Sequence, residues 1–153
     1  TADHVNAPFR EIYYNDLGLY SIPIFFYHPG SHLKGVVDSI PTQQIDIMPT
    51  VLAYLNYDKP YFAYGQDIFT TKASDKFVIN YNNGIYQLLQ DNLMLQFDGE
   101  KTKAVYNYKE DPLLRNNLYG QKPEEQNAME MLTKSVVQQY LVRMMENRLK
   151  IEN

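Results

Sequence analysis

The chain has 153 residues, 44% hydrophobic and 21% charged, which fits a folded globular protein and excludes disordered, collagen-like and coiled-coil chains. Its formal net charge of −4 leaves no basic surplus to neutralise a phosphate backbone, so we expect no nucleic-acid partner. Without cysteine, the sequence offers no disulfide, thiolate metal ligand or cysteine nucleophile. No apolar run reaches the roughly 18–20 residues of a membrane span, and the first ten residues lack a signal-peptide pattern, so we expect neither in this chain.

The first expected element is a strand at residues 22–27, whose sequence IPIFFY is a short continuous apolar run. The turn sequence His28-Pro29-Gly30 stops it. Such a run is typical of a central, parallel strand buried on both faces. Pro23 cannot donate to a neighbouring strand, so we place it at the start.

A helix is predicted at residues 44–56. Asp46 is placed to cap its first turn, Pro49 lies near its start, and Asn56 suits a left-handed end. Residues 57–69 are predicted to form a loop. The apolar positions of the helix follow one face: Met48, Val51, Leu52 and Leu55.

From residue 76 the apolar pattern changes to a period of two, which predicts strands. Turn signals such as Asn82-Asn83-Gly84 and Asp98-Gly99-Glu100 separate them. Short connections predict an antiparallel meander. The four expected strands are 77–81, 85–89, 93–97 and 104–108.

A long helix is predicted at residues 123–150, with Pro123 at its first position and two glutamates in its first turn. We expect its apolar stripe to cover the meander. The stripe comprises Met129, Leu132, Val136, Tyr140 and Met144, widened by Val137, Leu141 and Met145.

Asp3 and His4 are the clearest candidates for a functional site, because an adjacent carboxylate and imidazole can bind a divalent ion. Two ligands are too few for a closed site. His28 and His32 flank a turn, and we interpret them as structural. No catalytic triad order, HExxH sequence, EF-hand or phosphate-binding loop is present.

Taken in order, five segments resemble the C-terminal third of the sulfatase family, in the branch of the alkaline phosphatase superfamily that includes lipoteichoic acid synthase-like phosphoglycerol transferases. Their order and spacing carry the resemblance, which covers residues 1–118. The segments are TADH (1–4), IPIFFYHPG (22–30), IDIMPTVL (45–52), GQDIF (65–69) and DPLLRNNL (111–118).

The resemblance implies the C-terminal portion of an alkaline-phosphatase-like α/β/α sandwich. Residues 1–73 would be the remainder of the catalytic core, and residues 74–153 a subdomain of a four-stranded antiparallel sheet packed by the C-terminal helix. Asp3 and His4 would be metal ligands, while the nucleophile and the other ligands would lie upstream. The chain is then a fragment, and we expect it to be inactive alone.

The implied parent enzyme acts on sulfate or phosphate esters through a divalent metal ion. A strict sulfatase, with a Ser or Cys matured to formylglycine, and a phosphoglycerol or phosphoethanolamine transferase, with a Thr nucleophile, both remain open. Mn, Zn and Ca are the candidate metals; the imidazole of His4 favours Mn or Zn over Ca, and the transferase-like features favour Mn.

The partners implied are the missing N-terminal part of the same enzyme and a sulfated or phosphorylated small molecule, glycan or lipid. The implied location is extracytoplasmic, periplasmic or at the cell surface, with a membrane anchor in upstream helices. Two positions depart from the family pattern: Val5 and Asn56 stand where glycine is usual.

The alternative is a stand-alone, non-catalytic interaction or sugar-binding module whose Tyr-rich meander presents a surface. The two hypotheses differ in one property. A fragment exposes the edge at residues 22–27 and self-associates, whereas a module is a monomer with few exposed apolar patches.

Overall fold

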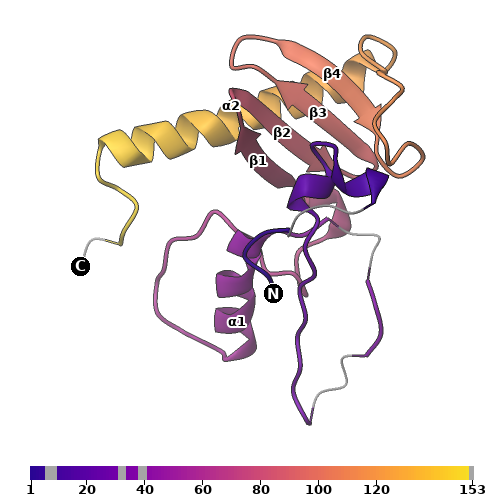
Figure 1. The fold of residues 1–153 in the computed structure, drawn as a ribbon. Helices are drawn as coiled ribbons and strands as arrows, with labels where there is room; N and C mark the ends of the chain where they lie inside the picture. The colour runs from indigo at the N-terminus through magenta and orange to yellow at the C-terminus, as the bar shows by residue number, and fades with distance from the viewer. Residues whose placement is uncertain (6–9, 31–33, 38–40, 152–153) are drawn as a thin grey trace.

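The computed structural model describes residues 1–5, 10–30, 34–37 and 41–151 (Figure 1). The chain combines helices with one four-stranded antiparallel sheet, so the expected α/β class is confirmed in its general form. No helix of the described ranges is long and apolar enough to cross a membrane. The main elements are α1 (Ile47–Tyr54), β1 (Val78–Asn82), β2 (Ile85–Gln90), β3 (Leu93–Phe97), β4 (Thr102–Asn107) and α2 (Pro123–Met145).

The sheet is a meander in the order β1-β2-β3-β4, as predicted. The first hairpin turns at Asn83 and Gly84, whose φ angles of 49° and 86° are the positive values that such a two-residue turn requires. The period-two pattern sends Leu88 and Leu95 to one face of the sheet and Leu89 to the other.

Both faces of the sheet are covered. On one face, Leu88, Leu95 and Val105 pack against Met129 of α2, which crosses behind the strands (Figure 1). On the other face, Leu17 packs against the cluster of Val78, Leu89 and Met94. Leu17 belongs to a segment, residues 10–20, that had no predicted structure and that contains two short 3₁₀ turns.

The predicted stripe on α2 covers the meander only in its N-terminal half, so the prediction is wrong for the remainder. Met129 is buried, and Leu132 packs against the same cluster. Beyond that half the helix runs past β1 (Figure 1), and Met145 is 86% exposed. The sheet is narrower than the helix is long. The spacing of apolar residues along α2 predicts which face is apolar, but it cannot predict how much of that face the sheet covers.

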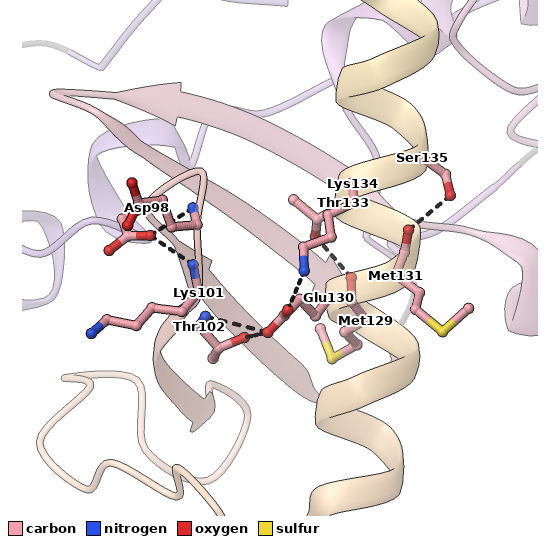
Figure 2. Close-up of polar contacts among 10 residues, drawn as sticks. Asp98, Lys101, Thr102, Met129, Glu130, Met131, Thr133, Lys134 and Ser135 are labelled. Carbon is pink, nitrogen blue, oxygen red and sulfur yellow. Dashed lines mark hydrogen bonds and ion pairs between the residues drawn. The ribbon is translucent and has the colours of Figure 1, made fainter.

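The polar attachment of α2 to β4 is shown in Figure 2. The Glu130 carboxylate accepts hydrogen bonds from the Thr102 hydroxyl at 2.5 Å and from the Lys134 ammonium group at 2.6 Å. Thr102 is buried. Hydrogen bonds from Lys134, and then from Thr102, hold the pKa of Glu130 below its usual value.

Glu130→Gln is expected to lower the free energy of unfolding by about 1–2 kcal/mol at neutral pH, because it removes a charged acceptor. A lowered folded pKa stabilises the fold above the unfolded pKa, roughly 4.3, and that stabilisation is lost as pH falls through the folded value. Urea unfolding at several pH values should therefore show the two proteins converging below about pH 4. A difference that is constant with pH would contradict this role.

The predicted strand at residues 22–27 is wrong for this chain. These residues form neither helix nor strand and pair with no described strand, and most of them are exposed. Phe25 and Tyr27 have exposed fractions of 78% and 89%. An apolar run forms a strand only where a neighbour supplies backbone partners, and nothing in the described part of the chain does so here.

The predicted helix at 44–56 is confirmed as a 3₁₀ turn, Gln44–Asp46, that leads into α1. Asn56 has a φ of 53°, so it takes the left-handed conformation expected at the helix end. The Tyr57 N–H then donates to the Leu52 carbonyl oxygen at 2.9 Å. Residues 57–69 form the predicted loop.

Candidate functional site

Asp3 and His4 lie at the surface, with side chains 89% and 75% exposed. The His4 ring Nδ1 is 3.0 Å from the Val5 carbonyl oxygen, which can only accept, so Nδ1 carries the proton. In the neutral ring, Nε2 is therefore free to bind a metal ion. The Val5 carbonyl, and then the Asp3 carboxylate, raise the pKa of His4.

The two side chains fit one ion as part of its donor set. His4 Nε2 and Asp3 Oδ2 are 3.6 Å apart. Two ligands about 2.1 Å from one ion lie roughly 3.0–3.4 Å apart at right or tetrahedral angles, so a small side-chain movement would suffice. Within the described ranges, no cluster of three or more His, Asp or Glu side chains suited to a metal ion is found, so the pair has no third partner there.

The pair is connected to the fold through Gln44, for which the sequence predicted no role. The Gln44 side-chain Nε2 donates to the carbonyl oxygens of Ala2 at 2.7 Å and Asp3 at 3.3 Å. The segment that carries the two candidate ligands is therefore held against the 3₁₀ turn before α1.

An open cleft of about 850 Å³ lies beside the pair. Asp3 and His4 line it together with Tyr20 and Tyr108. Lys109, also a lining residue, places its Nζ 5.6 Å from the centre of the Tyr108 ring. A ligand in the cleft would therefore meet aromatic rings, a lysine and the candidate metal ligands among the lining residues.

Asp46 caps the start of the helical segment, as predicted, through a capping box with Gln43, and it also makes a contact that was not predicted. Its carboxylate accepts from the backbone N–H of Gln43 at 3.0 Å and, across the fold, from that of Gln66 at 2.8 Å. No side-chain hydrogen bond caps α1. Burial raises the pKa of Asp46, whereas those two N–H groups and the charge of Lys76 act in the opposite direction. Sequence pattern predicted the cap but could not predict the Gln66 contact, because Gln66 is distant along the chain.

Thr50 joins the same loop to α1. Its hydroxyl donates to the Asp46 carbonyl oxygen at 2.6 Å and accepts from the Ile68 N–H at 2.9 Å. The buried Lys76 ammonium group donates to the Ile68 carbonyl oxygen. The segments IDIMPTVL and GQDIF are thus hydrogen-bonded to each other, so the polar residues that make these bonds have a structural role.

The segment DPLLRNNL has a similar structural role at the end of β4. The Asp111 carboxylate accepts from the Asn116 N–H at 2.7 Å. The Asn117 side-chain oxygen accepts from the Val105 N–H at 3.1 Å and from the Tyr119 N–H at 2.9 Å. The first of the two Asn117 bonds satisfies a backbone N–H of β4, which is an edge strand of the described sheet.

Of the other two histidines, His28 lies beside α1. The His28 ring lies 5.9 Å from the Tyr54 ring, in a small apolar hollow of about 190 Å³ beside α1. This contact agrees with its interpretation as structural. His32 lies outside the described residues.

No model of a known protein family matches the chain, and no curated protein sequence matches it significantly.

Proposed function

We propose that this chain is the C-terminal part of a metal-dependent enzyme of the sulfatase type, acting on sulfate or phosphate esters. The proposal depends mainly on the Asp3–His4 pair. His4 Nε2 carries no proton in the neutral ring and lies 3.6 Å from the Asp3 carboxylate. An open cleft beside it has room for a substrate. Asp3 and His4 would hold the metal ion, Mn in preference to Zn or Ca, and residues outside this chain would complete its ligands.

A bound ion would stabilise negative charge on the ester group and lower the pKa of a coordinated nucleophile. The chain's own residues have more limited roles. Asp3 and His4 supply an oxygen and a nitrogen donor, and the Val5 carbonyl keeps the His4 proton on Nδ1. No nucleophile is assigned to this chain, so we expect it to be inactive alone.

The exposed apolar surface supports the view that further polypeptide belongs against this chain. Phe26, Tyr27, Tyr54 and Phe69 line one hollow and form a surface that we call the aromatic face; the exposed Phe25 precedes it in sequence. Together the four leave roughly 450 Å² exposed. This area is as large as the largest apolar patch of a typical monomer, about 300–600 Å².

The reading frame upstream of Thr1 in the source gene tests the proposal. We expect it to continue upstream and encode a nucleophile motif, a Thr for a phosphoglycerol-type transferase or a Ser or Cys for a sulfatase. The longer protein should hydrolyse a chromogenic sulfate ester or phosphodiester, and this chain alone should not. A frame that opens at Thr1, or one Met before it, would overturn the proposal in favour of the interaction or sugar-binding module.

The isolated chain is expected to self-associate through the aromatic face. Its mass by light scattering should rise with concentration, and Phe25→Ser with Tyr27→Ser should restore a monomer, because both rings are nearly fully exposed. The control pair Tyr119→Ser and Met131→Ser removes exposed apolar groups elsewhere and should associate like the wild type. A wild-type chain that stays monomeric would instead favour the stand-alone module.

A further inference from the structure

We propose that Gln44 is a positioning residue for the Asp3–His4 pair, which it acts on through the backbone of residues 2 and 3. The inference rests on the proposed metal site. Gln44 Nε2 donates to the Ala2 carbonyl oxygen at 2.7 Å and to the Asp3 carbonyl oxygen at 3.3 Å. One amide group therefore holds both peptide units that flank the first candidate ligand.

These two hydrogen bonds join residues 1–5 to a distant part of the chain, 41 and 42 positions away. Other hydrogen bonds in the segment are local: the Thr1 hydroxyl bonds the Ala2 carbonyl, and the His4 N–H and ring bond its neighbours. Asp3 and His4 are exposed, so packing does little to fix their orientation. Without Gln44, the segment would have to be ordered by the ion itself, which weakens binding.

Gln44 can hold this segment because its own position is rigid. It lies in the 3₁₀ turn Gln44–Asp46, whose preceding residue Gln43 bonds the Asp46 carboxylate through its backbone N–H at 3.0 Å. The Gln43 side-chain oxygen also accepts from the Ile79 N–H of β1 at 3.1 Å. The turn is thus tied to the sheet, and Asp46 ties it to the loop at Gln66.

Titration of this chain with Mn²⁺ tests the inference, with free Mn²⁺ followed by electron paramagnetic resonance and broadening of the His4 ring protons by NMR. The titration is run at about pH 8, above the ordinary imidazole pKa near 6.5, because the pKa of His4 is raised and a metal ion binds the neutral ring. Gln44→Met removes the amide donors and keeps length and charge. Gln90→Met is the matched control, because Gln90 Nε2 also donates to a backbone carbonyl, that of Ser74, at 3.3 Å.

We expect the wild type and Gln90→Met to bind Mn²⁺ equally, Gln44→Met to bind about tenfold more weakly, and His4→Ala to lose the His4-centred site. Thermal unfolding should be unchanged in Gln44→Met, because Gln44 is exposed, which separates positioning from loss of fold. If Gln44→Met binds within about twofold of the wild type, the inference is overturned and the proposed function is unaffected. If His4→Ala binds like the wild type, the ion is elsewhere and the metal site of the proposed function fails.

Discussion

Asp46→Ala is expected to lower the free energy of unfolding by about 3–5 kcal/mol, because it removes the partner of several buried groups at once. The backbone N–H groups of Gln43 and Gln66 lose their acceptor. Lys76, itself buried, loses the nearby negative charge that acts on it. Urea unfolding followed by circular dichroism measures the loss.

Asp58→Ala is the matched control for this substitution. Asp58 is an aspartate that forms an ion pair with Lys59 at 3.6 Å, but both side chains are more than two-thirds exposed. An exposed pair contributes little, so the change should be within about 0.5 kcal/mol. Similar losses for the two variants would show that the Asp46 contacts do not hold the loop.

Gly65→Ala is expected to destabilise the chain by about 3 kcal/mol or more, at the upper end of the range for overpacking. An added Cβ would lie 1.9 Å from the Ile45 carbonyl oxygen and 2.7 Å from the Asp46 backbone nitrogen. Both are backbone atoms of the turn that carries Gln44, so they cannot move aside without displacing it. Thermal and urea unfolding should both show the loss.

Gly30→Ala provides the comparison for Gly65→Ala. Its added Cβ would be 3.4 Å from the nearest atom, the flexible ring of His28. We expect its stability to stay within about 1 kcal/mol of the wild type. If Gly65→Ala were tolerated equally well, the close approach of the loop to the Ile45 carbonyl would not be a constraint on the fold.

The meander was predictable because its signals are local. Alternating apolar residues mark each strand, and Asn83-Gly84 supplies the positive φ angles of the first turn. Antiparallel neighbours joined by short turns pair by default, so strand order followed from chain order. The start of α2 at Pro123 was equally clear, since proline is favoured at the first helical position.

Contacts between distant segments could not be predicted in the same way. Residues 10–20 pack on the second face of the sheet, where Gln96 Nε2 donates to the Asp16 carboxylate at 2.7 Å. The sequence around Asp16 gives no signal that predicts this partner. The Gln44 contact with Asp3 is similar, because an exposed glutamine in a helical turn has no sequence signature of its own.

Local sequence was therefore enough for the four strands of the meander, for both helices and for the turns between those strands, because backbone preference and side-chain periodicity decide these within a few residues. It was also enough to single out Asp3 and His4 as a potential ligand pair. Three-dimensional packing decided the rest: that residues 22–27 pair with no described strand, that Asp46 bonds Gln66, and that Gln44 bonds the backbone of residues 2 and 3. These outcomes depend on which distant backbone groups come within hydrogen-bonding distance, and that is a property of the folded chain.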